Sequence, residues 1–291
     1  MSATVKSTSA TPHDPVALDA AAAGRRAADF VTLTKPRLNF LVVLTALAGY
    51  ALGVEPGAPV AVLVHTVLGT ALVAGGASAL NQLWEKDTDR LMRRTRLRPL
   101  PDLRVRPADA LWFGVGLSIA GLVELWVFAN ALAAIVAALT LISYVLFYTP
   151  LKLRTSLSTI IGAVPGALPA VIGWVAATGQ ASIEAWVLFA IVFMWQMPHF
   201  LAIGWMYRDD YAEAGIPLLP VIQPDGRSTG RQAVLYAGAM IPVTMLPSFV
   251  GLASPYYMVG ALVLGLVVLV HSVEFAATRS LVSARRLFFG T

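Results

Sequence analysis

Cysteine is absent from the sequence, and charged residues are scarce. None of the 291 residues is cysteine, which excludes disulfides, thiolate metal sites and a cysteine nucleophile. Charged residues make up 13% of the chain and hydrophobic residues 57%, whereas soluble domains carry roughly 25% charged residues. Apolar runs of about 17 residues or more recur, and such runs are typical of helices that cross a membrane. The composition therefore predicts a polytopic, all-helical membrane protein.

Residues 1–28 lack a continuous apolar core. Asp14 and Asp19 interrupt the one stretch that could form it, so a signal peptide is not expected here. We expect residues 1–28 to form a disordered cytoplasmic tail. The remaining residues, 29–291, are expected to form a single intramembrane domain.

Eight apolar stretches are long enough to cross a bilayer. Several contain glycine or proline, which membrane helices tolerate better than soluble ones do. The predicted spans are residues 37–54, 59–83, 109–129, 131–149, 157–177, 184–207, 231–251 and 255–276.

Lysine and arginine are missing from every second connection between these spans. The connections near 55–58, 130, 178–183 and 252–254 contain neither, so all 21 positive residues lie in the N-terminal segment, the other connections and the C-terminal end. Because Lys and Arg accumulate on the cytoplasmic side of membrane proteins, the pattern predicts an N-terminus inside the cell. Without a clear organelle presequence, we expect the inner (plasma) membrane of a bacterium.

The two long polar connections follow the second and the sixth predicted span, and both are rich in acids. An offset of four spans preserves the orientation of the chain in the membrane. The sequence thus predicts two four-helix halves around a central cavity, each with an acidic cytoplasmic loop.

The first acidic connection begins with NQLWEKDTDRLMRRTRLRPL, residues 81–100. Asn81, Glu85 and Asp89 are four residues apart and share one face of a helix. Oxygen ligands of this kind suit Mg²⁺, which is usually shared with substrate phosphates. The second acidic connection adds Asp209 and Asp210 as further candidate metal ligands. Glu213 follows one turn later, and the pattern leaves open which of these acids would bind metal.

Basic residues follow the acids at once, and arginine suits bidentate binding of phosphate. Acids and arginines belong together if the ligand is a diphosphate bridged by Mg²⁺, because the metal screens the carboxylates from the phosphates. A diphosphate is also a leaving group whose departing charge such a site neutralises. The alternative is that these residues only set topology, which we favour for Arg104 and Arg106. The candidate diphosphate ligands are Arg37, Arg90, Arg93, Arg94, Arg98 and Lys152.

Five stretches together resemble the protohaem IX farnesyltransferase (haem O synthase) family, within the UbiA-type intramembrane prenyltransferases. They are TKPRLNFLVVLTALAG, NQLWEKDTDRLMRRTRLRPL, YTPLK, WQMPHFLAIGW and DDYAEAGIPLLP, and the likeness extends from about residue 31 to about 288. The resemblance implies a helical bundle around a central cavity. It also implies transfer of a farnesyl group from farnesyl diphosphate to a vinyl group of haem B, with addition of water and with Mg²⁺ as cofactor.

The same resemblance assigns roles to residues and suggests partners. Asn81, Glu85 and Asp89 match the family's first acidic motif, and Tyr148 and Lys152 match its tyrosine–lysine pair near the diphosphate. These five are the predicted catalytic residues. The implied protein partners are a haem-oxidising enzyme or assembly factors of a terminal oxidase.

The sequence departs from the family pattern at two places. Where the wider superfamily has two acids before Gly215, this chain has Tyr207 and Tyr211. The family also usually has nine spans, and the ninth would begin at the final stretch, SARRLFFGT.

A haem substrate raises the question of which side chains contact the porphyrin. His199 and Trp195, in WQMPHF, are the candidates, because they lie in the sixth span towards the acidic side. The alternative for His199 is a hydrogen bond to a neighbouring helix.

Two other functions stay open at this stage. The same diphosphate site could prenylate a quinone precursor or a chlorophyll-type pigment. A transporter is less favoured, because the acids lie at helix ends and not at the membrane midplane.

Overall fold

The computed structural model describes residues 15–291, with side chains from Gly24 onward. Every regular element in this part of the chain is helical, as the composition predicts. The elements are α1 (Pro15–Leu33), α2 (Pro36–Gly53), α3 (Val60–Asp89), α4 (Pro107–Phe128), α5 (Ala131–Ile142), the π-helical segment η1 (Ser143–Tyr148), α6 (Thr149–Leu151), α7 (Ser158–Thr178), α8 (Ile183–Met206), α9 (Arg208–Glu213), α10 (Leu219–Ile222), α11 (Arg227–Phe249), α12 (Pro255–Thr278) and α13 (Leu281–Gly290).

Eight helical stretches in the described part are long and apolar enough to cross a membrane. They are α2, α3, α4, the continuous run from α5 to α6, α7, α8, α11 and α12. The eight predicted spans are therefore confirmed, with boundaries that shift by a few residues. The largest shift is in α3, which continues to Asp89 and so keeps the first acidic motif helical.

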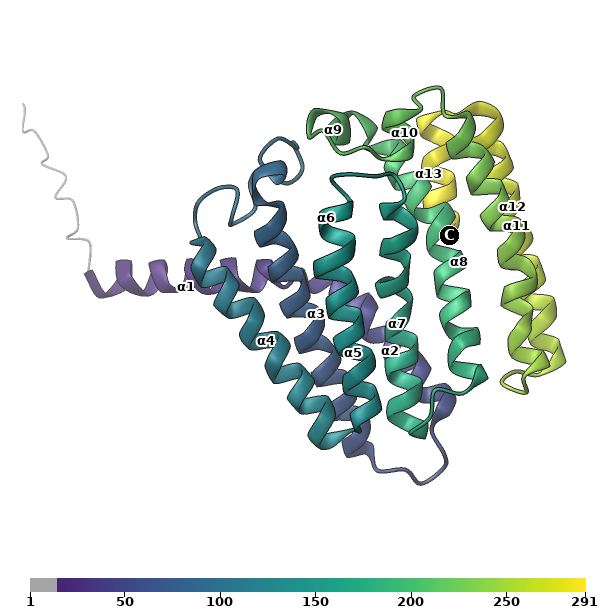
Figure 1. Ribbon diagram of the computed structural model, residues 1–291, viewed down its shortest axis with the longest axis horizontal. Helices are drawn as coiled ribbons and strands as arrows, with labels where there is room; N and C mark the ends of the chain where they lie inside the picture. The colour runs from purple at the N-terminus through teal and green to yellow at the C-terminus, as the bar shows by residue number, and fades with distance from the viewer. Residues whose placement is uncertain (1–14) are drawn as a thin grey trace, which may run out of the picture.

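Two four-helix halves lie next to each other in the bundle, one formed by α2 to α5 and the other by α7, α8, α11 and α12 (Figure 1). They meet where α2 crosses α7. A Cβ atom on Gly173 would lie 1.8 Å from the carbonyl oxygen of Ala46, and one on Gly49 would lie 2.1 Å from that of Ala170. Only glycine permits such close approach of two backbones, so these residues fix how the halves are joined.

Helix α1 runs across the direction of the bundle helices (Figure 1). Its last turn is anchored by Leu33, which is fully buried, and by Phe30, whose ring meets that of Phe113 edge to face. The first fourteen residues of the predicted tail lie outside the described residues, and the rest of it, from Pro15, belongs to this helix. The C-terminal helix α13 packs against α8 and α12, where the sequence pattern places the start of a ninth span.

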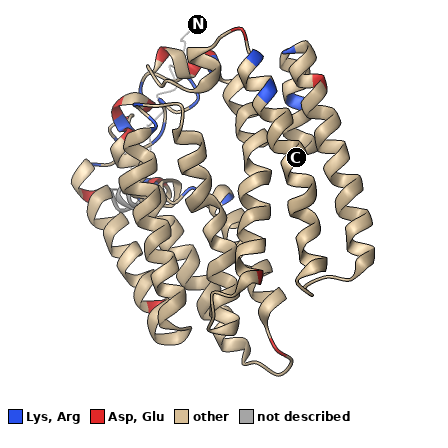
Figure 2. Ribbon diagram, turned by 45° about the vertical axis from the view of Figure 1, so that its right-hand side comes forward, with Lys and Arg blue, Asp and Glu red and all other residues tan. Residues whose placement is uncertain are grey.

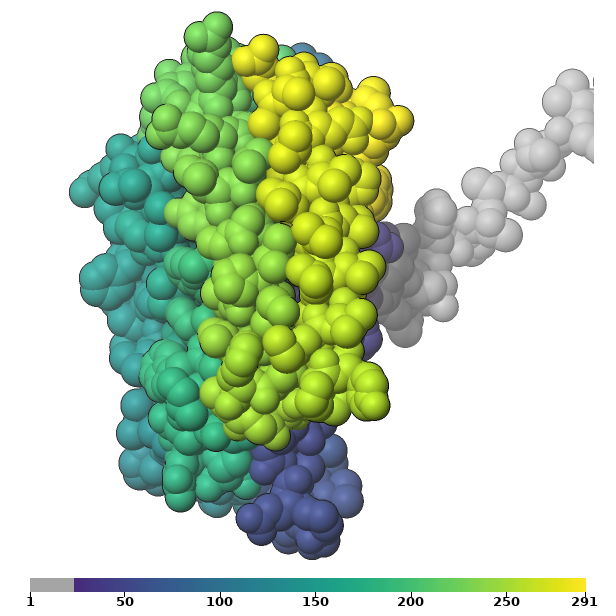
Figure 3. Space-filling model, turned by 90° about the vertical axis from the view of Figure 1, so that its right-hand side faces the viewer, coloured from purple at the N-terminus to yellow at the C-terminus, as the bar shows by residue number. Residues whose placement is uncertain are grey.

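Lysine and arginine gather at one end of the bundle (Figure 2). We name this end, with the connections 90–106, 152–157, 207–226 and 279–280, the charged end. On the sides, α11 and α12 run next to each other (Figure 3). Val259, Leu264 and Val270 are among the exposed apolar side chains of α12. A bundle with apolar sides and a charged end is that of a multi-pass membrane protein.

Candidate active site

The last turns of α3 carry the first acidic motif into a pocket at the charged end. Asn81, Glu85 and Asp89 are all buried and lie along one face of the helix, as their spacing predicts. The pocket has a volume of about 120 Å³, below the roughly 300–1,000 Å³ of sites that enclose a drug-sized ligand. It therefore suits a charged head group and not a whole porphyrin. Its lining residues are Lys35, Asn81, Glu85, Asp89, Met92, Arg94, Thr95, Arg98, Tyr144, Tyr148 and Lys152.

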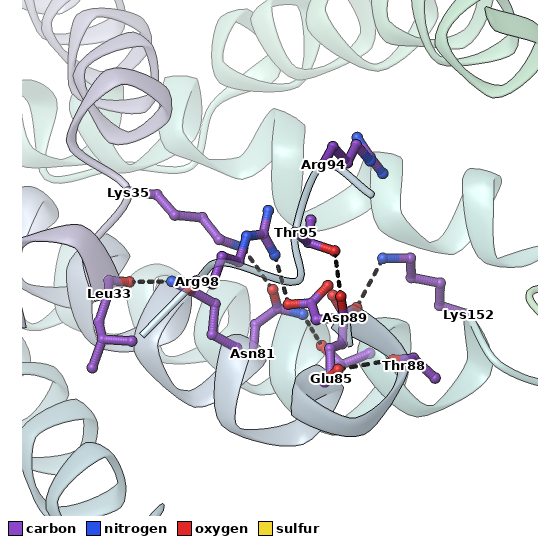
Figure 4. A network of polar contacts seen from close by, with 12 residues as sticks. Leu33, Lys35, Asn81, Glu85, Thr88, Asp89, Arg94, Thr95, Arg98 and Lys152 are labelled. Atoms are coloured by element: carbon purple, nitrogen blue, oxygen red, sulfur yellow. Dashed lines mark hydrogen bonds and ion pairs between the residues drawn. The ribbon is translucent and has the colours of Figure 1, made fainter. Parts of the chain in front are cut away.

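Both carboxylates in the pocket are paired with a cation from another part of the chain (Figure 4). The Lys152 ammonium donates to Oε1 of Glu85 at 2.9 Å, and the Arg98 guanidinium donates to Oδ2 of Asp89 at 2.7 Å. Burial lowers the pKa of Lys152, but the charge and hydrogen bond of Glu85, together with the nearby Tyr148 and Tyr211, raise this pKa above its usual value. Lys152 is therefore positively charged at the pocket wall.

Lys35 makes the third contact to the motif, and the sequence did not single it out as a site residue. Its ammonium donates to Oδ1 of Asn81 at 2.8 Å, and burial lowers its pKa to about 8. Lys35 joins α1 to α2 with φ 49° and ψ 60°, a left-handed conformation that is uncommon for a residue other than glycine. This turn places the Lys35 side chain against α3, where it reaches Asn81. In the sequence, Lys35 stands in the stretch TKPR, among the positive residues of the N-terminal segment.

The π-helical segment η1 forms another wall of the pocket. Single π-helical turns are rare and often occur at functional sites. Here η1 presents Tyr144 and Tyr148 to the pocket, with their rings stacked at 5.4 Å between centroids. Gly162 of α7 leaves room for Tyr148, since a Cβ atom there would lie 2.5 Å from the ring. Asn81 is held from this side as well, because its amide donates to the Thr149 hydroxyl at 3.1 Å.

The second oxygen of Asp89 has no partner among the described residues. Oδ1 is buried and makes no hydrogen bond, although Oδ2 binds Arg98. A buried carboxylate oxygen without a partner is costly in free energy, and a cation bound there removes that cost. Together with Glu85 and Asn81, it offers the oxygen donors that Mg²⁺ prefers. The residues present therefore fit a magnesium ion.

The predicted diphosphate ligands divide into two groups. Arg94, Arg98 and Lys152 line the pocket. The other three do not line it. Arg90 donates to the Pro101 carbonyl at 2.9 Å, Arg93 is exposed and 3.8 Å from Glu213, and Arg37 is exposed at the start of α2.

The second acidic connection forms α9, and its acids do not join the first motif. The side chain of Asp209 is 93% exposed, and neither it nor Asp210 lines the pocket. Within residues 24–291, no group of three or more His, Cys, Asp or Glu comes together. Tyr207 and Tyr211 are closer to the site, because both rings contact Arg94.

The two candidate haem-contact residues lie on α8, away from the pocket lining. The rings of Trp195 and His199 stack at 5.2 Å between centroids. His199 Nδ1 is 2.8 Å from the Thr291 hydroxyl, and the Trp195 indole donates to the carbonyl of the same residue. His199 also stacks on Phe288 of α13 at 4.6 Å. It thus makes the hydrogen bond to a neighbouring segment that the sequence left as its alternative.

The chain belongs to the UbiA prenyltransferase family, whose sequence model matches residues 42–291. It is 49% identical over 266 residues to the protoheme IX farnesyltransferase of Solibacter usitatus, covering 88% of this chain and 91% of that protein. It is 46% identical to the protoheme IX farnesyltransferase of Myxococcus xanthus, covering 82% and 81%. Among solved structures, a UbiA homolog from Archaeoglobus fulgidus bound to GPP and Mg²⁺ is 14% identical. It superposes with a TM-score of 0.68 over 90% of this chain and 99% of the other. This likeness shows that the chain has the fold of that protein.

Proposed function

We propose that this protein transfers the farnesyl group of farnesyl diphosphate to a vinyl group of haem B, producing haem O and diphosphate. The observation that supports this most directly is the buried pocket where Glu85 and Asp89 meet Lys152 and Arg98. Relatives that are 46% and 49% identical are named for this reaction. Both the site chemistry and the family point to transfer from an allylic diphosphate.

The first step of the proposed reaction breaks the bond between the farnesyl C1 atom and the diphosphate oxygen. Lys152 and Arg98 lie where they can bind the phosphate oxygens, and Asn81, Glu85 and Asp89 would hold Mg²⁺ beside them. The metal, when bound, supplies charge neutralisation for the leaving diphosphate. The lysine and arginine then keep the departing charge stabilised, which lowers the barrier to ionisation.

The second step joins the allylic cation to the terminal carbon of a haem vinyl group. The positive charge that this leaves next to the porphyrin ring is quenched by water, which adds its oxygen and releases a proton. Atoms balance as haem B, farnesyl diphosphate and water giving haem O, diphosphate and a proton. The cation must be kept from water until it meets the vinyl group, and the apolar helices around the pocket suit that requirement.

We place the protein in the inner (plasma) membrane of a bacterial cell, with its charged end and active site in the cytoplasm. All Lys and Arg lie in the N-terminal segment, the C-terminal end or every second connection, in agreement with the positive-inside rule. Since the chain has no cysteine, the variants Arg96→Cys and Gly57→Cys give single labelling sites at opposite ends. An impermeant maleimide should label only Gly57→Cys in intact cells, and the reverse pattern would invert the proposed orientation.

The identity of the acceptor is tested by letting two candidate acceptors compete for the farnesyl group. Purified protein receives labelled farnesyl diphosphate, Mg²⁺ and a mixture of haem B and 4-hydroxybenzoate, a quinone precursor. The proposal predicts that label enters the haem fraction. Label in the hydroxybenzoate fraction would keep the diphosphate chemistry and replace the acceptor. Label in neither fraction would reject haem B as the acceptor.

A further inference from the structure

Arg94 contacts two tyrosine rings from the other acidic connection. Its guanidinium carbon lies 5.0 Å from the ring centroid of Tyr207 and 4.9 Å from that of Tyr211. One guanidinium nitrogen also donates to the Tyr211 hydroxyl at 2.7 Å. Arg94 follows α3, whereas Tyr207 immediately precedes α9 and Tyr211 lies on it. The contact therefore joins two connections that are more than a hundred residues apart in the sequence.

Arg94 differs from the other cations in the pocket in what its charge is paired with. Lys152 and Arg98 are each paired with a carboxylate, and Lys35 donates to the amide oxygen of Asn81. Within the described residues, Arg94 lies within ion-pair distance of no carboxylate, although it lines the same pocket. The faces of aromatic rings attract a guanidinium without neutralising it. The rings therefore fix the side chain and leave its positive charge available to an anion.

The packing beneath Tyr211 couples α9 to this arginine. Tyr211 is buried in a small apolar cluster with Met92, Ala214 and Ile216. Met92 lies two residues before Arg94 and itself lines the pocket. Any movement of α9 away from the pocket would thus separate the rings from Arg94 and expose the cluster.

We propose that Tyr207 and Tyr211 are positioning residues: they form an aromatic clamp that aims Arg94 at the diphosphate and couples α9 to the occupied pocket. This inference rests on the proposed function, because it takes the ligand to be a diphosphate ester. It assigns to the second acidic connection a role through its aromatic rings, distinct from the metal-binding role predicted for Asp209 and Asp210. The clamp orients the Arg94 guanidinium without pairing it to a carboxylate, so that its charge is available to the diphosphate.

A double-mutant cycle on ligand affinity tests the clamp. The probe is a farnesyl diphosphate analogue with sulfur in place of the bridging oxygen, bound to the full-length protein with Mg²⁺ and measured by calorimetry. We expect Tyr207→Leu to weaken binding roughly tenfold, in the range of a partly desolvated cation–π contact. In an Arg94→Gln background, the same Tyr207→Leu change should have almost no further effect. Tyr211→Phe, which keeps the ring, should weaken binding less than Tyr207→Leu and serves as the cycle partner if Tyr207→Leu does not fold.

Two matched controls lie outside the clamp and the pocket. Arg96→Gln removes an exposed arginine from the same connection, and Tyr256→Leu removes an exposed tyrosine at the start of α12. Both should bind the probe as the unmodified protein does. Independent, multiplicative effects of Arg94→Gln and Tyr207→Leu would overturn the clamp while the diphosphate site stands. Failure of the unmodified protein to bind the probe would instead overturn the proposed function, and the clamp with it.

Discussion

Asp89 has one carboxylate oxygen bound by Arg98 and the other buried without a hydrogen-bond partner in the described structure. This division suits a side chain that orients itself through one oxygen and coordinates a cation through the other. The arginine then holds the carboxylate in place before any ligand arrives. Asp89 is therefore the residue at which the metal assignment can be tested with least disturbance to the fold.

The change Asp89→Asn should lower farnesyl transfer at least about 100-fold, because bound metal contributes several kcal/mol of charge stabilisation in such reactions. Arg98 remains 30% exposed, so its lost partner should cost little stability. Initial rates over a range of Mg²⁺ concentrations, together with the unfolding midpoint in detergent, measure both effects. Activity within twofold of the unmodified protein would remove Asp89 from the metal site.

Lys35 offers a test of a residue that only the structure brought to the site. We expect Lys35→Met to raise the KM for farnesyl diphosphate about tenfold, since a hydrogen bond from a charged group contributes roughly 1.5–3 kcal/mol. The control is Lys86→Met, which removes a lysine paired with Asp87 outside the pocket. If KM is unchanged and only the unfolding midpoint falls, Lys35 serves the fold and not the substrate.

Residues of the first motif could be predicted because helical spacing alone places Asn81, Glu85 and Asp89 on one face. Lys35 could not be predicted in the same way. Its contact with Asn81 spans 46 residues and depends on the left-handed turn at Lys35 itself. The role proposed for Tyr211 depends likewise on a contact with Arg94 across 117 residues, and no local pattern encodes it.

At the scale of elements, α7 packs both against α2 and against the wall of the site. Helix α7 carries Gly162, against which Tyr148 packs, and it also carries the glycine that touches α2. The most apolar window of α7 is 67% buried, compared with 17% for α2. α7 is therefore the most buried of the eight membrane-spanning helices in the described structure.

Gly173→Ala should destabilise the protein by about 1–3 kcal/mol, as overpacking of a close contact does. The added methyl group would collide with the Ala46 carbonyl and push α2 away from α7. The matched control is Gly116→Ala on α4, where a Cβ atom would meet nothing within 4 Å. Thermal unfolding in detergent should show a lower midpoint for the first variant alone, and equal midpoints would mean that the crossing is not tightly packed.

The spans could be read from the sequence because a bilayer demands long apolar runs, and these are visible without any contact information. The short elements could not be read in this way. The segment η1 looks like ordinary apolar helix in the sequence, and neither its π geometry nor its packing against α7 has a local signal. Residues 1–28 were expected to form a disordered tail, whereas residues 15–28 belong to α1. Phe30 and Leu33, just beyond them, pack against the rest of the bundle.

At the scale of the whole molecule, the polar pocket and the apolar surface that contacts the membrane lie at different places along the bundle. The pocket and most of the charged side chains lie at one end, while the sides expose apolar residues such as Leu264. An enzyme that joins a lipid-soluble isoprenoid to a porphyrin benefits from this arrangement. The diphosphate can be handled at the membrane surface while both apolar groups stay within the bundle or the bilayer.

The central claim is farnesyl transfer to haem B, and one measurement tests it most directly. Purified protein is incubated with haem B, farnesyl diphosphate and Mg²⁺, and the haem fraction is analysed by reverse-phase chromatography and mass spectrometry. The account predicts a more strongly retained haem whose mass has increased by one farnesyl group and one hydroxyl group. This product should be lost when a chelator removes Mg²⁺ and when Asp89 is replaced by asparagine. Haem B recovered unchanged while the protein is folded and binds farnesyl diphosphate would contradict the account.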